Sequence, residues 1–102
     1  QRTTNARALD VFAVAYSPDG MTIATGSLDC KVRLWRAHDG THHCTLHGHE
    51  GIVYAVAYST DGTTIATGSE DWTVRLWRAS DGAHKRTLRG HEHSVRAVAY
   101  SP

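Results

Sequence analysis

Short runs of apolar and β-branched residues alternate with polar turns along this chain, and each run has the length of one strand. In the first half of the chain these runs fall at 11–17, 22–27, 32–36 and 42–46. Asp-Gly pairs at 19–20 and 39–40 separate neighbouring runs, and such pairs are typical of hairpin turns because the turn requires positive φ. No segment has a helical period. The pattern therefore predicts an all-β chain whose neighbouring strands are antiparallel.

The same pattern returns after 42 residues. Residues 11–52 and 53–94 align without gaps, and 29 of the 42 aligned positions are identical. A third copy begins at Val95, and residues 1–4 align with the last strand of a copy, so we predict nine strands and an edge remnant. The second strand of each copy consists of small residues on both faces, which suits a sheet packed on both sides. Stacked four-stranded units of this period predict a radial array of blades.

Several motifs of the second copy together resemble one WD repeat. They are Gly48-His49, Val53, the Ser-x-Asp-Gly turn, Gly68-Ser69-Glu70-Asp71 and Val74-Arg75-Leu76-Trp77. The resemblance covers essentially residues 1–102 and implies antiparallel four-stranded blades of an incomplete β-propeller. The chain departs from the family in two places: both copies have Trp-Arg where the family has Trp-Asp, and Ala6-Arg7 replaces the first Gly-His.

The resemblance also divides the chain into four segments. Residues 1–10 are expected to be a remnant of a preceding outer strand and loop, 11–47 blade one, 48–89 the Gly-His loop with blade two, and 90–102 a loop with the first strand of a third blade. The chain holds only about 2.4 repeats, whereas a closed propeller has about four to eight blades. We therefore expect an excerpt of a longer repeat protein. The alternative is a ring that closes between chains.

A buried hydrogen-bond network inside each blade is implied by the resemblance. In the second copy Trp77 is expected to donate to Ser69, Ser69 to meet His49, and His49 to meet Asp71. The first copy keeps a partial set, Ser27, Asp29 and Trp35, with Arg7 as a candidate partner of Asp29. A hydrolase triad of Ser69, His49 and Asp71 is the sharper alternative. It is disfavoured because no Gly-x-Ser-x-Gly elbow is present and Ser27 recurs without a matching histidine. We predict no catalytic residue.

A partner-binding face is implied at the top entrance of the propeller channel. The family positions that line this entrance, with the residue beside them, are Phe12, Leu28, Tyr54, Glu70, Trp72 and Arg96. An exposed aromatic side chain next to an acid suits a basic or apolar side chain of a partner, although drift at surface positions also explains why the copies differ here. The predicted function is a protein-interaction scaffold without chemistry of its own, in contact with other proteins or peptides and with neighbouring blades of the same or another chain. The alternative is a regulatory sensor propeller fused to a signalling enzyme, such as a nucleotide-binding switch protein.

Composition limits the classes of partner and of site that the chain is expected to have. With 11 basic and 10 acidic residues the net charge is +1, which disfavours nucleic acid, and no apolar run is long enough to span a membrane. Two cysteines without an export signal indicate a reducing, cytoplasmic location, with the nucleus as a second intracellular option. The histidine-rich segment 42–49 could supply metal ligands, but its side chains alternate between two strand faces, and Lys85 and Arg86 replace His43 and Cys44 in the next copy. We predict no metal and no cofactor.

Overall fold

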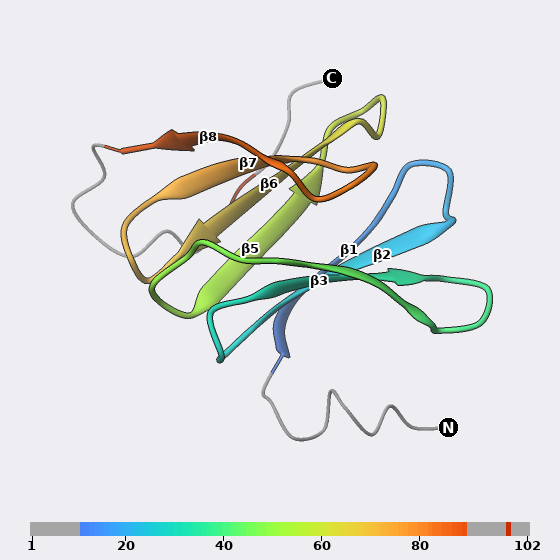
Figure 1. Ribbon diagram of the computed structural model, residues 1–102, viewed down its shortest axis with the longest axis horizontal. Coiled ribbons are helices and arrows are strands. Elements are labelled where there is room, and N and C mark those ends of the chain that lie inside the picture. Colours follow the sequence, from blue (N-terminus) through green and yellow to red (C-terminus); the bar gives the residue numbers. More distant parts are fainter. Residues whose placement is uncertain (1–10, 90–97, 99–102) are drawn as a thin grey trace.

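The computed structural model describes residues 11–89 and residue 98, and residues 11–88 contain two antiparallel sheets of four strands each (Figure 1). The strands are β1 (Val11–Tyr16), β2 (Thr22–Ser27), β3 (Val32–Arg36), β4 (His42–Leu46), β5 (Val53–Tyr58), β6 (Thr64–Ser69), β7 (Val74–Arg78) and β8 (His84–Leu88). In both sheets the strand order follows the chain order. The predicted all-β fold of incomplete propeller blades is confirmed. The expected remnant at 1–4 lies outside the described residues, as does the ninth strand apart from Val98.

The connections gather at two opposite ends of the sheets. The turns 17–21, 37–41, 59–63 and 79–83 lie at one end, which we call the Asp-Gly end and which is on the right in Figure 1. The connections 28–31, 47–52 and 70–73 lie at the other end, called the loop end. Residues 11–89 contain no helix that is long and apolar enough to cross a membrane.

Each Asp-Gly turn is held by its own aspartate side chain. Asp19 Oδ1 accepts hydrogen bonds from Ser17 Oγ at 2.6 Å and from the Met21 amide at 2.9 Å. Gly20 has a φ of +75°, a conformation that glycine adopts without steric cost. The amide of Ser17 already pairs with the carbonyl of Thr22 at 2.8 Å, so the predicted turn forms as the sequence indicated, with β1 ending at Tyr16.

One apolar core joins the two sheets at the seam between them. It contains Ala24, Val32, Leu34 and Leu46 from the first sheet, and Val53, Ile65 and Trp77 from the second. Strand β5 packs against β1 and β2, and a Cβ placed on Gly26 would lie 2.6 Å from Cγ1 of Val53. The sheets therefore approach so closely that only glycine fits at this position of β2.

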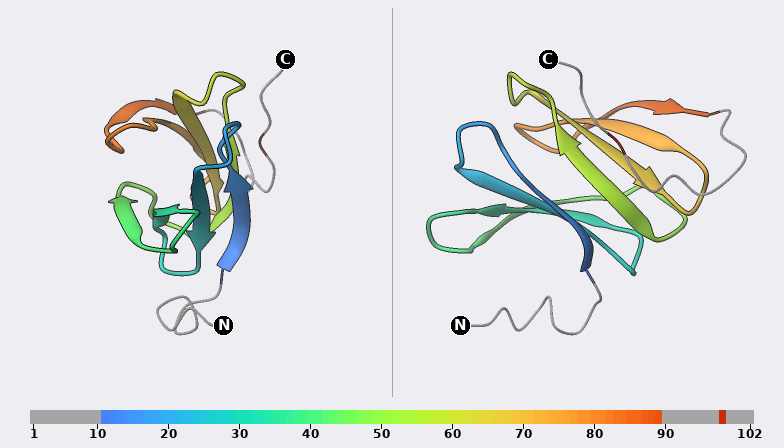
Figure 2. Two further views of the ribbon diagram at one scale, coloured as in Figure 1. Left: turned by 90° about the vertical axis from the view of Figure 1, so that its right-hand side faces the viewer. Right: turned by 180° about the vertical axis from the view of Figure 1, so that it is seen from behind.

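A residue that lies at the seam is buried, whereas its equivalent in the other repeat is exposed. Val53 is fully buried while Val11, its counterpart, is 39% exposed, and Leu46 is 1% exposed while Leu88 is 40% exposed. The two sheets face one another through one face each, as the views in Figure 2 show. Val98 packs against the smaller cluster of Ala66 and Val74. Val56, one period earlier, packs against the main core.

Candidate functional site

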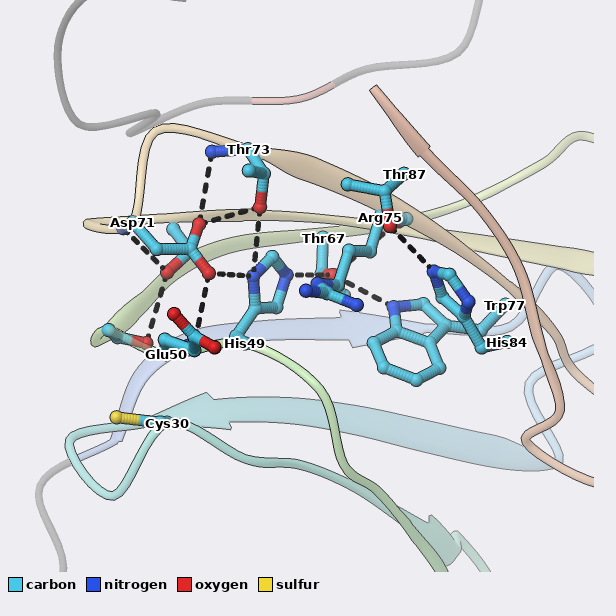
Figure 3. Close-up of polar contacts among 12 residues, drawn as sticks. Cys30, His49, Glu50, Thr67, Asp71, Thr73, Arg75, Trp77, His84 and Thr87 are labelled. Carbon is cyan, nitrogen blue, oxygen red and sulfur yellow. Dashed lines mark hydrogen bonds and ion pairs between the residues drawn. The ribbon is translucent and has the colours of Figure 1, made fainter. Parts of the chain in front are cut away.

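A chain of hydrogen bonds runs through the second sheet from an indole to a carboxylate (Figure 3). Trp77 Nε1 donates to Thr67 Oγ1 at 2.9 Å, and Thr67 Oγ1 lies 2.6 Å from His49 Nε2. On the other side of the ring, His49 Nδ1 lies 2.9 Å from Asp71 Oδ2. The His49 side chain is only 1% exposed, so each polar atom of this chain needs its partner within the protein.

A neutral His49 satisfies every member of this chain. Because Thr67 accepts from the Trp77 indole, its own hydroxyl proton is free to donate to His49 Nε2. His49 then carries its proton on Nδ1 and donates it to Asp71. Burial lowers the pKa of His49, and the nearby Asp71 carboxylate only partly opposes this shift. The neutral imidazole thus fits these hydrogen bonds and is also the form that burial favours.

Asp71 connects two segments of the loop end. It accepts hydrogen bonds from the Thr73 amide at 3.0 Å, from Thr73 Oγ1 at 2.6 Å and from the Glu50 amide at 2.9 Å. Burial alone would raise the pKa of Asp71, but the hydrogen bonds from Thr73, Glu50 and His49 outweigh burial and hold the pKa well below its usual range. The ionised carboxylate thus ties the 47–52 connection to the 70–73 turn.

The expected role of Ser69 is wrong, and Thr67 has that role instead. Ser69 Oγ donates to the Gly51 carbonyl at 3.0 Å and accepts from the Asp71 amide at 3.1 Å, and it makes no hydrogen bond with His49 or Trp77. Serine, histidine and aspartate are therefore not assembled as a hydrolase triad. The strand pairing could have identified Thr67, because it lies on the same face of β6 as Ser69 and is two residues closer to Ile65, which pairs with Trp77.

In the first sheet the equivalent residues form two separate hydrogen-bonded groups instead of one chain. Trp35 Nε1 donates to Thr25 Oγ1 at 3.0 Å, while Asp29 accepts from the Ser27 hydroxyl and from Arg33 Nη2, the latter at 2.5 Å. Burial would raise the pKa of Asp29, but the bonds from Arg33 and Ser27 lower it to about 2. Ser27, Asp29 and Trp35 thus belong to two separate groups rather than one chain. Arg7, the candidate partner of Asp29, lies outside the described residues.

The loop-end carboxylates of the two sheets, Asp29 and Asp71, have different partners. Arg33 pairs with Asp29, whereas Asp71, the equivalent carboxylate, is bonded to His49. The counterpart Arg75 has a buried Nε without a hydrogen-bond partner in the described part of the chain. In the second repeat, His49 of the Gly-His loop thus bonds to the loop-end carboxylate, as Arg33 does in the first repeat.

The loop end also carries the residues predicted to contact a partner. Phe12 and Tyr54 come from the two sheets, and their rings meet edge to face with centroids 5.6 Å apart. Phe12 is 46%, Leu28 44% and Trp72 51% exposed. Trp72 has a φ of +71°, as Cys30 does with +74° at the equivalent position, so the turn itself directs these side chains. Glu70 precedes this turn and is exposed, and Arg96 lies outside the described residues.

The two histidines of strand β4 make contacts with different residues. The ring of His42 meets the Trp35 ring edge to face at 5.4 Å, and its Nε2 lies 2.8 Å from Thr45 Oγ1. His43 Nε2 lies 3.4 Å from the Ser80 carbonyl of the second sheet. Within residues 11–89 no group of three or more potential metal ligands comes together, and Cys30 and Cys44 are free thiols.

Comparison with known proteins points to one family. The family model described as "WD domain, G-beta repeat" matches residues 2–36 and 40–78. The periodic tryptophan protein 2 homolog of Dictyostelium discoideum is 55% identical over 40 residues, which are 39% of this chain and 4% of that protein. The solved structures of U3-55K and of the RRP9 WD40 repeats are each 25% identical to this chain and superpose with a TM-score of 0.81.

These relatives are much longer than the matched region. Each of the two superposed structures covers 84% of this chain, which in turn spans 28% of theirs. The family model alone accounts for most of the residues printed here, and the two sheets have the blade architecture that it implies. The chain belongs to the WD40 repeat family.

Proposed function

We propose that this chain is part of a protein-interaction scaffold and that its partner binds at the loop end. WD40 repeats generally bind other proteins and are non-catalytic. The observation that carries the proposal is the exposed apolar group at the loop end, where Phe12, Leu28 and Trp72 are each between 44% and 51% exposed. Exposed aromatic side chains on a fixed framework are typical of protein interfaces. The chain supplies no chemistry of its own in this proposal.

The framework under this face supports the proposal because it is held in place before a partner arrives. The Glu70 amide donates to the Ile52 carbonyl at 2.8 Å, and the Trp72 amide donates to the Ser69 carbonyl at 3.2 Å. Asp71, between them, is bonded to Glu50 and Thr73. A face that is already ordered loses little conformational entropy on binding.

The residues at this face also indicate the chemistry of the partner. Glu70 is exposed and comes two residues before the exposed Trp72, and Tyr54 and Phe12 form an edge-to-face pair between the blades. A basic side chain with an apolar stem, or a short apolar segment flanked by a basic residue, matches such a surface. Leu28 and Cys30 stand at the equivalent positions of the first repeat, so the two blades present different surfaces.

None of the relatives named above is described as a signalling enzyme, so the hypothesis of a sensor domain gains no support. We propose an intracellular location, because both cysteines are free thiols. No finding favours the cytoplasm over the nucleus.

The proposal is tested by comparing partners bound by matched variants of the full-length protein. Isotope-labelled affinity purification would compare the unchanged protein with the Tyr54→Ala/Glu70→Ala double variant and with Met21→Ala. Met21 is 68% exposed and lies in an Asp-Gly turn, so it controls for loss of an exposed apolar side chain elsewhere. We expect the double variant to lose a protein that Met21→Ala retains, with affinity reduced by more than about 1 kcal/mol. Retention of all partners by the double variant, or loss of binding after nuclease treatment, would contradict the proposal.

A further inference from the structure

The two carboxylate oxygens of Asp71 hold different segments of the loop end. Oδ1 accepts from the Thr73 amide at 3.0 Å and from Thr73 Oγ1 at 2.6 Å, and these bonds fix the 70–73 turn. Oδ2 accepts from His49 Nδ1 and from the Glu50 amide, each at 2.9 Å. Residues 47–50 are therefore attached to this carboxylate through one oxygen, while the turn has the other.

The first sheet shows the same carboxylate position with an arginine on the second oxygen. Asp29 Oδ1 accepts from the Lys31 amide at 3.3 Å, as Asp71 Oδ1 does from the Thr73 amide. Asp29 Oδ2 accepts from Arg33 Nη2 at 2.5 Å. The oxygen that is bonded to histidine in the second sheet is thus bonded to arginine in the first.

The second sheet has an arginine at the equivalent position, on an equivalent backbone. Cys30 and Trp72 have φ values of +74° and +71°, so the two turns have the same form. Arg33 and Arg75 each follow three residues later and are each paired in register with a threonine of the neighbouring strand. Because Arg33 reaches its carboxylate from this position, Arg75 is long enough to reach Asp71.

Arg75 is instead packed under residues 47–50. A Cβ placed on Gly48 would lie 2.9 Å from Arg75 Nη1, and Figure 3 shows Arg75 among the residues of the hydrogen-bond chain. Its Nε is buried and has no hydrogen-bond partner in the described part of the chain. A cationic donor in such a place has lost water without gaining an acceptor, and a bond to a carboxylate would compensate this loss.

We propose that residues 47–50 form a latch that can leave Asp71 while the blade stays folded, because Arg75 then replaces His49 on Oδ2. The exchange avoids the main cost of opening, which is a half-buried carboxylate left without a partner. Thr67 would still accept from the Trp77 indole. Arg75 is in this way a second partner for Asp71, and the first sheet shows the arrangement that it would adopt.

The connection stays attached beyond the latch. Ser69 Oγ donates to the Gly51 carbonyl at 3.0 Å, and the Glu70 amide donates to the Ile52 carbonyl at 2.8 Å. Neither bond involves Asp71, so opening is confined to 47–50. The latch lies at the loop end, where it can change the proposed partner face. Its test uses no partner, so the two proposals can fail independently.

Hydrogen exchange of the Glu50 amide in the full-length protein tests the latch. This amide is bonded to Asp71 Oδ2, so it exchanges when the latch opens, and it should exchange faster than the Thr73 amide on Oδ1. Arg75→Met removes the partner of Asp71 in the open state. We therefore expect exchange of the Glu50 amide to slow by about tenfold, which corresponds to about 1.4 kcal/mol.

The sign of this effect separates the latch from a purely structural role. An arginine that only supports the closed segment would give faster exchange of the Glu50 amide when it is removed. Arg33→Met is the matched control, because Arg33 pairs with Asp29 in the other sheet and should leave Glu50 exchange unchanged. Unchanged or faster exchange in Arg75→Met, equal slowing in Arg33→Met, or equal rates for the Glu50 and Thr73 amides would each overturn the proposal.

A second variant keeps the test decisive if Arg75→Met does not fold. His49→Ala removes the histidine from the latch, and a crystal structure of the full-length variant should show an Arg75 Nη atom within hydrogen-bond distance of Asp71 Oδ2. Arg33 should stay on Asp29 in the same crystals. An Arg75 side chain that keeps its present position in His49→Ala, with Asp71 bonded to the turn alone, would overturn the proposal.

Discussion

Gly26 of the first sheet lies directly against Val53 of the second. A Cβ at position 26 would be 2.6 Å from Val53 Cγ1, which is shorter than real Cβ contacts, and 3.2 Å from the Val53 carbonyl oxygen, which is tighter than most of them. Gly26 is in the extended strand β2, so its role is to permit close approach rather than an unusual backbone angle. The spacing of the two blades therefore depends on a missing side chain.

Gly26→Ala should destabilise the protein by about 2 kcal/mol, because the added methyl group overpacks the seam. The measurement is the free energy of unfolding of the full-length protein from denaturant titration. Val53→Ala shortens the facing side chain, so the Gly26→Ala/Val53→Ala double variant should be more stable than the sum of the two single effects predicts. Simple additivity would show that the two residues do not meet in solution.

Thr67→Val should cost about 2 kcal/mol, because it leaves the Trp77 indole and His49 Nε2 unpaired in a buried place. Thr25→Val is the matched control in the first repeat. Thr25 serves one partner, Trp35, so its loss should cost about 1 kcal/mol or less. The two variants would be compared by denaturant midpoints. Equal midpoints would mean that the histidine adds nothing to the network.

The fold was predictable from the sequence because its signals are local. Asp-Gly turns and strand-length apolar runs are each set by a few adjacent residues, and both copies of the 42-residue repeat contain them. The hydrogen-bond network could be predicted only with the strand register as well. Ser69 and Thr67 share a strand face, and only the pairing of Ile65 with Trp77 shows which one reaches the indole.

Other parts of the site depend on contacts between distant segments. The pairing of Arg33 with Asp29 follows from the position of the carboxylate in its turn, and no motif of the sequence indicates it. The Tyr58 hydroxyl is buried because the first sheet covers this part of the second, whereas its counterpart Tyr16 is 63% exposed. Tyr16 and Tyr58 lie in the same segment, Ala-Val-Ala-Tyr-Ser, but Tyr16 is 63% exposed while the Tyr58 hydroxyl is buried, so sequence pattern alone could not separate them.

Arg33→Met should destabilise the protein by about 1 kcal/mol more than Arg75→Met. Arg33 bonds to Asp29 and Ser27, so its loss removes two contacts from a half-buried carboxylate group. Arg75 has a buried Nε with no partner in the described part of the chain, and methionine retains most of its apolar stem. Unfolding free energies of both variants check the order. A greater loss for Arg75→Met would show that Asp71 uses arginine rather than histidine.

The pH dependence of stability should contain a contribution from His49. Burial lowers its pKa below the ordinary value of 6.5, so the folded protein takes up this proton at a lower pH than the unfolded chain does. The stabilisation from His49 is thus complete above pH 6.5 and is lost as the pH falls from there toward the pKa of the folded state. Asp71 adds a separate loss at more acidic pH, because its pKa is also lowered.

His49→Gln separates this contribution from that of the other histidines. Glutamine has no proton to gain in this range, so the stability advantage of the unchanged protein over the variant should shrink as the pH is lowered from about 8 to about 5. Denaturant titrations of both proteins at several pH values measure this difference. An advantage that grows toward acidic pH would mean that His49 is charged in the folded protein and forms an ion pair with Asp71. A constant advantage would mean that His49 contributes packing alone.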